Sequence, residues 1–430
     1  MPTKIIADKK IDLYELMFNC HEKISVTLKN NFILNLRSNI ASKYSSIYQF
    51  TKLAFPKKNQ QILTSTYLKK YQNKRPSIPV HILKKILSKL KIDKKTIYKN
   101  VLFFSKHTGK KHKIPRYLKI TDDLAYFIGI YLAEGKNETK RKVRVSITNT
   151  DINIILFFLD FIEKYFQIER KDLNFYLYNL KPEDSLKKVE KRLRIPPQTI
   201  NIQKSKRGNK LIIEACKDSS IHRLIIDKIK YILLPSITNN QSFSERFFQG
   251  VADGEGHIRN SDYKQDFSIE MYNQKVLDTL ELICRLNKVI PSRKENILTI
   301  SLANLKKLNF EPFKYNKKRL NRYRELRPKI DNSNHVQRNN FTYKLLKTLK
   351  ESQISPKTDE LYHQMGHKSR APNHFRKISK KAKSDGLIKI SQDKKAHRFF
   401  ITKKGINYIN IINQQRLKRI EQLHNLIKWA

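Results

Sequence analysis

A short pattern of residues occurs twice in this chain of 430 residues. The first copy is AYFIGIYLAEGK, from Ala125 to Lys136, and the second is RFFQGVADGEGH, from Arg246 to His257. After each copy comes a segment that alternates apolar and polar residues, as a strand does, and then an apolar segment with helical spacing. A repeat of this kind predicts two halves of similar fold, related by a pseudo-twofold axis.

Both copies carry small residues four positions apart, which places them on one face of a helix. They are Gly129 and Ala133 in the first copy, and Gly250 and Gly254 in the second. A helix face without side chains allows the backbone of a second helix to come close. We therefore predict that the two repeated segments are helices that cross tightly at the centre of the fold.

Each predicted helix ends in an acid followed by a glycine, Glu134 with Gly135 and Glu255 with Gly256. We expect both glycines to end their helices in a left-handed conformation. Pairing the helices brings the two carboxylates together at helix carboxyl ends, where the dipole and their mutual repulsion disfavour negative charge. The acids could simply be solvated there. Because the two copies are in register, we favour a Mg²⁺ site formed by these four residues, and we read Asp253 as secondary.

The charge of the chain indicates a polyanionic partner. Its 89 Lys and Arg residues against 38 Asp and Glu give a net charge of +51 and an isoelectric point near 10.1. Such a field repels itself unless a partner such as nucleic acid shares it. The alternative is the surface of an organism that favours lysine, but such surfaces usually balance lysine with glutamate. In VRVSIT, Val143, Val145 and Ile147 alternate with polar residues, so one strand face is left for an outside partner.

The remaining composition predicts an intracellular protein, cytoplasmic or associated with the nucleoid. Cys20, Cys216 and Cys284 are widely spaced and odd in number, so neither a disulfide framework nor a zinc cluster is indicated. The most apolar run, IILFFLDFI from Ile154, is too short to span a bilayer, and we expect no membrane partner. The N-terminus has no secretory signal pattern.

The segments FIGIYLAEG and FQGVADGEG resemble the two signatures of LAGLIDADG homing endonucleases, in the archaeal, monomeric form that carries both copies in one chain. The resemblance covers residues 118–325. It implies an α+β fold with an αββαββα unit in each half, a saddle of antiparallel strands in the DNA major groove, and Mg²⁺-dependent cleavage of both strands. The acid at the eighth motif position, here Glu134 or Glu255, would bind the metal. Tyr131 and Leu132 depart from the family pattern, but not at the ligand position.

The resemblance also implies basic residues near the centre of the saddle, beside the scissile phosphate. We select Lys317 and Lys210 as catalytic candidates, with Lys314 and Lys318 close behind Lys317. All four could instead contact phosphates without a catalytic role, or be solvated. The residues that we expect to bind DNA are Arg144, Lys204, Lys206, Arg259, Lys294, Lys314, Lys318, Arg376, Lys377, Lys380 and Lys381.

Composition divides the chain into residues 1–115, two halves at 116–235 and 236–330, and a C-terminal unit at 341–430. The first region reads as short helices and resembles the helix-turn-helix unit ahead of some archaeal LAGLIDADG cores, with a basic connector at 105–115. Its candidate groove-reading segment contains Thr64, Ser65, Lys69 and Lys70, although the unit could also be a packing cap. Residues 322–340 have the polar composition of a linker.

The C-terminal unit looks like a winged helix. Its basic segment RAPNHFRKISKKAK, from Arg370, places Phe375, Ile378 and Ala382 on one apolar stripe and its cations outside, where a DNA contact competes with simple solvation. Gly386 would end this helix, and the strands around Asp393 would form the wing.

These patterns predict a monomeric, site-specific DNA endonuclease that cuts both strands with Mg²⁺ and spreads an intron or another mobile element. Two alternatives reuse the same fold without cutting DNA. One is a DNA-binding transcriptional regulator, and the other is a maturase that folds intron RNA. Because Glu134 and Glu255 are both present, the sequence favours the nuclease.

Overall fold

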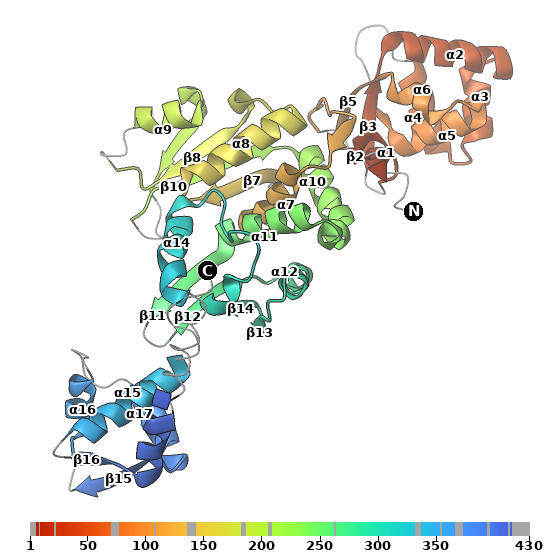
Figure 1. The fold of residues 1–430 in the computed structure, drawn as a ribbon. Helices are drawn as coiled ribbons and strands as arrows, with labels where there is room; N and C mark the ends of the chain where they lie inside the picture. The colour runs from red at the N-terminus through yellow and green to blue at the C-terminus, as the bar shows by residue number, and fades with distance from the viewer. Residues whose placement is uncertain are drawn as a thin grey trace, which may run out of the picture. The chain divides into compact units, whose positions relative to one another are not determined.

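The computed structural model describes residues 6–7, 9–20, 23–69, 77–106, 109–135, 143–181, 186–204, 209–261, 264–331, 337–352, 355–365, 373–393, 396–411 and 413–414. The chain forms two compact units, unit 1 from Met1 to Arg327 and unit 2 from Pro328 to Ala430. The fold is α+β, as predicted (Figure 1).

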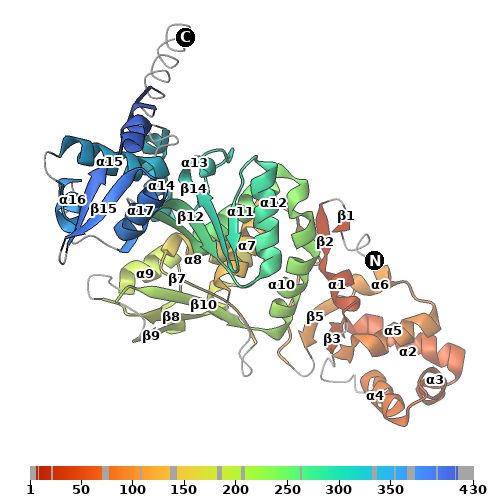
Figure 2. The ribbon, with the colours of Figure 1, turned by 90° about the horizontal axis from the view of Figure 1, so that it is seen from below.

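Two helices that carry the repeated segments form the centre of unit 1. They are α7 (Asp122–Glu134) and α11 (Gln241–Glu255), and they lie side by side in Figures 1 and 2. Each begins at a polar cap: Thr121 Oγ1 accepts from the amide of Leu124 at 3.3 Å, and Asn240 Oδ1 accepts from the amide of Phe243 at 3.0 Å. The predicted helix pair is confirmed.

The crossing of α7 and α11 is as tight as the glycines predict. A Cβ atom on Gly129 would lie 2.4 Å from the carbonyl oxygen of Phe247, and one on Gly250 would lie 2.3 Å from that of Tyr126. Real Cβ atoms do not approach backbone oxygen this closely, so any side chain at either position would force the helices apart. The absence of side chains therefore sets the distance between the two halves.

Half 2 follows the predicted αββαββα order. After α11 come β11 (Gly256–Ser261), β12 (Lys264–Glu270), α12 (Gln274–Leu286), β13 (Ser292–Lys294), β14 (Ile297–Ser301), the short α13 (Leu302–Leu305) and α14 (Lys317–Asp331). The strands pair antiparallel in the order β11-β12-β14-β13.

Half 1 has the same plan with an addition. After α7 come β7 (Arg144–Asn149), α8 (Ile152–Phe166), β8 (Asn174–Tyr178), α9 (Leu186–Leu193), β9 (Ile200–Gln203), β10 (Ile212–Asp218) and α10 (Ser220–Leu233). The sheet order is β7-β10-β8-β9, and β9 pairs parallel with β8. The position that corresponds to β11 falls at residues 136–142, which lie outside the described residues.

The core of half 1 lies between α7 and α8. The apolar side chains of α8 pack on α7, and the ring of Phe127 stacks on Phe161 with centroids 4.1 Å apart. Phe127, Phe158 and Phe161 are all buried. This packing anchors α7 against α8.

The N-terminal part of unit 1 combines helices with two small sheets. The sheets have the strand orders β1-β2-β6 and β4-β3-β5. The strands are β1 (Ile6–Ala7), β2 (Lys10–Asp12), β3 (Ile24–Leu28), β4 (Ile78–Pro79), β5 (Val101–Lys106) and β6 (Tyr117–Lys119). The helices are α1 (Leu13–Phe18), α2 (Asn30–Tyr44), α3 (Ile47–Ala54), α4 (Lys58–Lys69), α5 (Val80–Leu90) and α6 (Lys94–Tyr98).

This arrangement differs from the purely helical region expected over residues 1–115. The strands are short, and short apolar runs such as the buried β3 look alike in helices and strands. The chain is not divided at the basic connector, because β2 pairs with β6 beyond it and both belong to unit 1. Thr64 on α4 is fully buried, so the expectation that it reads a DNA groove is wrong. Lys70 lies outside the described residues.

Residues 322–331 continue α14 rather than forming a linker. Leu320, Tyr323 and Leu326 are buried at helical spacing, while most other residues of the helix are charged. Because only one narrow face packs, the composition resembles that of a linker although the backbone is helical.

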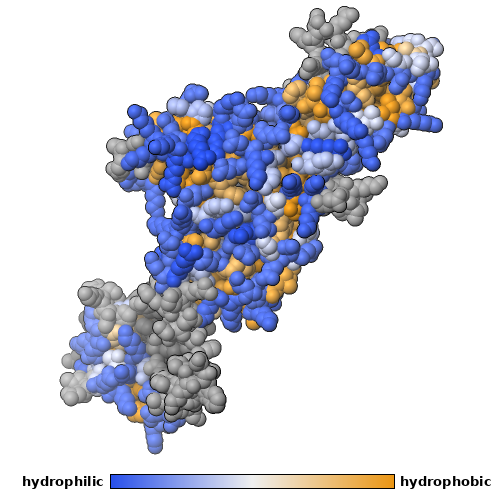
Figure 3. All heavy atoms as spheres, turned by 45° about the horizontal axis from the view of Figure 1, so that its top comes forward, coloured by the Kyte–Doolittle hydropathy of each residue, from blue (hydrophilic) through white to orange (hydrophobic). Residues whose placement is uncertain are grey.

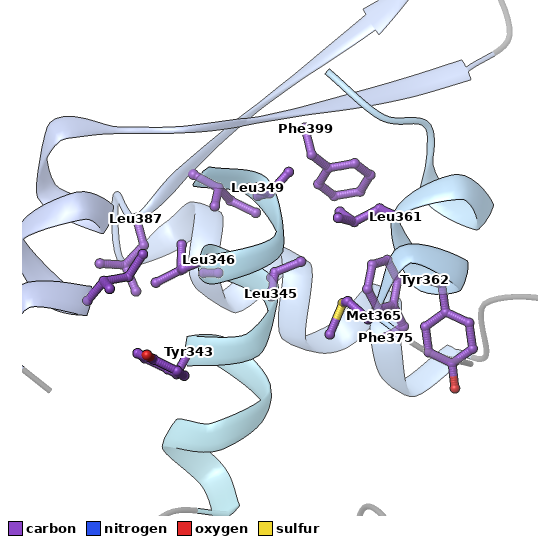
Figure 4. Packing of buried hydrophobic residues seen from close by; sticks show 13 residues of the cluster. Tyr343, Leu345, Leu346, Leu349, Leu361, Tyr362, Met365, Phe375, Leu387 and Phe399 are labelled. Atoms are coloured by element: carbon purple, nitrogen blue, oxygen red, sulfur yellow. The ribbon is translucent and has the colours of Figure 1, made fainter. Parts of the chain in front are cut away.

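Unit 2 has its own core (Figure 4). Its labelled elements are α15 (Gln337–Glu351), α16 (Thr358–Gln364), α17 (Asn373–Ser384) and the antiparallel hairpin of β15 (Ile388–Asp393) and β16 (Ala396–Ile401), and residues 403–411 are also helical. Phe375 and Ala382 are buried as predicted, and Gly386 adopts a left-handed φ of +72° beyond α17. The side chain of Ile378 lies outside the described residues. In the part of the chain that is described, no helix is long and apolar enough to span a bilayer.

Candidate metal and DNA-binding site

Glu134 and Glu255 are the last residues of α7 and α11, and the crossing brings them together. A Cβ atom on Gly254 would lie 3.0 Å from Cγ of Glu134 and 2.6 Å from Cβ of Ala133. The side chain of Glu134 therefore packs against Gly254, the residue directly before Glu255. The sequence correctly places both acids at one end of the helix pair.

Gly135 and Gly256 do not adopt the left-handed conformation that the sequence led us to expect. Their φ and ψ values are −68° and 128°, and −70° and 133°, because the chain passes directly from each helix into strand pairing with Ile147 or Ile269. A Cβ atom on either glycine would lie within 2.4 Å of the carbonyl oxygen four residues before it. Space, rather than a positive φ, requires glycine here. A metal-binding role for these residues stays a prediction.

The surroundings of the two acids disfavour their negative charge. Burial, followed by repulsion from Glu255, raises the pKa of Glu134 to about 8. Burial also raises the pKa of Glu255, and the neighbouring Glu270 adds to this shift. Opposing these effects, Asn149 donates a hydrogen bond of 2.7 Å to Glu134. A further positive charge beside Glu134 and Glu255 would therefore stabilise their ionised forms.

Arg319 is the cation that both acids share, and the sequence did not identify it. Its charge lowers the pKa of Glu134 and of Glu255. Its guanidinium donates to the carbonyl oxygens of Asp253 at 2.7 Å and Gly254 at 2.8 Å, at the carboxyl end of α11. The preceding lysines are equivalent to it in sequence, because tertiary contacts and the cap at Asn316 decide which face of α14 meets α11.

The sequence predicted only a secondary role for Asp253. In the structure this residue instead holds the start of α14 in place. It is buried, accepts from the hydroxyl of Tyr126 at 2.6 Å, and accepts from the amide of Tyr315 at 2.7 Å. The amides of Lys314 and Asn316 donate to it at 3.2 Å. Burial raises the pKa of Asp253 to about 6 despite these bonds. This carboxylate therefore ties α7, α11 and α14 together and positions Arg319.

The residues present fit a hard divalent cation. Two carboxylates converge with an unfavourable charge, and Mg²⁺ prefers a few carboxylate oxygens while it keeps water or phosphate oxygens as its other ligands. Among the described residues, no three His, Cys, Asp or Glu side chains gather into a metal cluster. The arrangement therefore suits a site that substrate phosphates complete, rather than a closed structural metal site.

The candidate catalytic lysines separate into different surroundings. Lys210 and Lys318 line one cavity of about 1110 Å³ together with Arg319. Lys317 lines another cavity, of about 450 Å³, whose other lining residues include Asp123, Asp160 and Tyr315. Lys210 and Lys318 thus line the same cavity as the cation that neighbours the acids, whereas Lys317 lines a different one.

Lys314 also faces away from that cavity. Its ammonium lies 5.5 Å from the ring centroid of Tyr126 and 4.9 Å from that of Tyr315, and 3.9 Å from a carboxylate oxygen of Asp123. Burial lowers its pKa. These contacts place it beside the first turn of α7 rather than at the helix end that carries Glu134.

A third cavity, of about 640 Å³, lies on the other flank of the helix pair. Glu255 and Glu270 line it together with the basic residues Arg223 and Lys230 of α10. Asp227 adds a third carboxylate. The two flanks of the crossing therefore differ in charge, although the backbone around them is pseudo-symmetric.

The predicted DNA-contacting arginines of the sheets are held by acids. Arg144 lies 3.4 Å from Glu214 and 3.3 Å from Asp218, and Arg259 lies 2.7 Å from Asp266. Lys204 and Lys294 are exposed. Lys206 lies outside the described residues. Fixed arginines of this kind are suited to base contacts, while exposed lysines are suited to phosphates.

In unit 2, the predicted cations of α17 face outward. Arg376, Lys380 and Lys381 are exposed, while the side chain of Lys377 lies outside the described residues. Hydrophilic side chains predominate on the face of the molecule in Figure 3. DNA contact by these residues stays a prediction.

The raised pKa of Glu134 predicts a pH-dependent stability in the absence of divalent cations. The carboxyl has a pKa of 4.5 when unperturbed and about 8 in the fold, so between these values the folded state binds more protons than the unfolded state. The free energy of unfolding of wild type should therefore fall relative to Glu134→Gln as pH rises through this window. The slope should be at most about 1.4 kcal/mol per pH unit.

Urea denaturation of both proteins in a chelating buffer measures this difference. Mg²⁺ added at the alkaline end should restore stability to wild type more than to Glu134→Gln, since only wild type keeps both carboxylates. Parallel pH profiles would show that Glu134 ionises normally and that the acids do not repel each other.

Comparison with known proteins gives structural neighbours only. No protein-family model and no curated protein sequence matches this chain. The N-terminal LAGLIDADG domain of DUF199/WhiA is 12% identical, with a TM-score of 0.25, over 44% of this chain and 83% of that one. The homing endonuclease I-DmoI in complex with DNA and Mn is 16% identical, with a TM-score of 0.24, over 42% of this chain and 90% of that one.

Full-length DUF199/WhiA from Thermotoga maritima is 13% identical, with a TM-score of 0.26, over 61% of this chain and 89% of that one. These neighbours are LAGLIDADG-fold proteins. Similarities this weak do not decide between a nuclease and a protein that binds DNA without cutting it.

Proposed function

We propose that this protein is a Mg²⁺-dependent endonuclease of the LAGLIDADG homing type, which cuts both strands of a long DNA site. One observation carries the proposal: Glu134 and Glu255 converge at the carboxyl ends of two tightly crossed helices, and their shared neighbour Arg319 lines a cavity rich in cations. For stability alone this is a poor place for two acids. For holding a cation against a phosphodiester it is a suitable one.

In this proposal the acids hold the metal, and neighbouring residues set the orientation and the charge of the acids. When bound, Mg²⁺ supplies an activated water and stabilises the leaving oxygen. Asn149 orients Glu134 through its hydrogen bond, and Arg319 limits the repulsion between the acids. Lys210 and Lys318 would meet the scissile phosphate from the cavity that they share. Lys317 is the weaker candidate because it lines a different cavity.

The outer faces of the two sheets would bind the duplex, with Arg144 and Arg259 among the base contacts. The basic face of α17 in unit 2 would lengthen the bound site, in keeping with the net charge of +51. Cutting at such a site would promote the insertion of a mobile element. A regulator or maturase would not need two acids at the crossing, and no contact of the described residues favours either.

Selection of a duplex from a random library, followed by incubation in Mg²⁺, tests the proposal. We expect both labelled strands to be cut in Mg²⁺, and binding without cutting in a chelating buffer. Binding without cutting in either buffer would indicate the regulator. Preference for structured RNA over every duplex would indicate the maturase.

A further inference from the structure

Half 1 carries an insertion that half 2 lacks. In half 2, β13 and β14 are joined directly through Glu295 and Asn296. In half 1, the corresponding strands β8 and β10 are separated by residues 179–211, which contain α9 and the parallel strand β9. Pseudo-symmetry therefore does not explain α9, and the cleavage chemistry proposed above does not use it.

The insertion is firmly attached to half 1. Val189 and Leu193 on one face of α9 are buried. The guanidinium of Arg170, itself buried, donates to the carbonyl oxygen of Leu193 and pairs with Asp160 and Glu163 of α8. This contact satisfies the carboxyl end of α9 and fixes its orientation.

That orientation points one side of α9 into the large basic cavity. Lys188 and Arg192, one helical turn apart, both line it, and Arg192 donates to Oδ1 of Asn153 at 3.0 Å. Lys187 and Lys191 are also exposed but do not line the cavity. The helix thus carries two pairs of similar cations with different surroundings.

This cavity is far more basic than the cavity of about 640 Å³ that Glu255, Glu270 and α10 line. Besides the two cations of α9, one carboxylate, that of Asp151, lines it. Five further cations also line it, and they are Lys181, Lys210, Lys318, Arg319 and Arg322. The cavity of about 640 Å³ is lined by two cations and three carboxylates. A concentration of positive charge this large attracts a polyanionic backbone much more strongly on one flank than on the other.

We propose that α9 clamps the sugar-phosphate backbone of duplex DNA on the half 1 side, through Lys188 and Arg192, and that half 2 has no equivalent clamp. This inference rests on the proposed function, because it takes the partner to be duplex DNA. It adds that one flank of the DNA site is held through more phosphates than the other.

Binding measured in a chelating buffer tests the clamp without any need for cutting. The variant is Lys188→Gln with Arg192→Gln, which removes both charges and keeps a polar side chain at each exposed position. The matched control is Lys187→Gln with Lys191→Gln on the same helix. With the duplex selected above as the probe, the first variant should lower the slope of log affinity against log salt by about 2, one for each lost phosphate contact.

The control variant should keep the wild-type slope, and both variants should unfold at the wild-type temperature because no buried residue changes. Hydroxyl-radical footprints should lose protection at one end of the site only, and only in the first variant. Equal slopes for both variants, or protection lost at both ends, would overturn the clamp. Wild type that binds no duplex at all would instead overturn the proposed function.

Discussion

Replacement of both Glu134 and Glu255 by glutamine is expected to abolish cutting of both DNA strands while leaving the fold at least as stable. Glutamine keeps the size of each side chain but removes the charges that attract the cation. It also removes the mutual repulsion that adds to burial in raising the pKa of Glu134 to about 8. Cutting should fall by roughly 10³-fold or more, and binding in a chelating buffer should persist.

Single exchanges show whether each acid serves one strand. Glu134→Gln and Glu255→Gln should each leave nicked products, which labels on both strands resolve. Glu325→Gln, an exposed glutamate on α14, is the matched control and should cut normally. A double variant that still linearises its substrate would place the chemistry elsewhere in the molecule.

Replacement of Gly250 by alanine is expected to give the largest loss of stability from the smallest change. The new Cβ would lie 2.3 Å from the carbonyl oxygen of Tyr126 and 2.9 Å from the amide nitrogen of Ile130. Both are backbone atoms of α7, so relief requires the two helices to separate. We expect the free energy of unfolding to fall by about 3 kcal/mol, near the upper range for overpacking.

Chemical denaturation of the full chain measures this effect, and Gly386→Ala provides the control. A Cβ on Gly386 would make only an ordinary contact of 3.7 Å with the side chain of Lys404, so alanine at its φ of +72° should cost only about 1 kcal/mol. That loss should appear in the transition of unit 2, whereas Gly250→Ala should affect unit 1. If Gly250→Ala is as stable as wild type, the helices do not cross at this residue.

The sequence could predict the helix pair because the repeat encodes it locally. Small residues four apart define a face, and the pairing of the acids follows from their positions at the helix ends. The role of Asp253 could not be predicted, since its partners Lys314, Tyr315 and Asn316 lie some sixty residues away. Gly135 was misinterpreted because a tight approach and a left-handed turn both select glycine.

The elements around the helix pair were harder to predict. The small N-terminal strands are too short to show a period, and α14 buries too narrow a face to look helical by composition. Arg319 could be separated from the lysines before it only once the cap at Asn316 fixed the first turn of α14. In each case a tertiary contact, rather than local pattern, decides the outcome.

The parallel strand β9 and helix α9 occur in half 1, whereas half 2 joins its strands by a short turn. Proteins whose two reading surfaces are identical select inverted repeats, because each arm of the DNA must satisfy the same contacts. Here the arms of a bound duplex would meet unlike surfaces. The preferred sequence should therefore lack dyad symmetry, and the protein should bind it in one direction only.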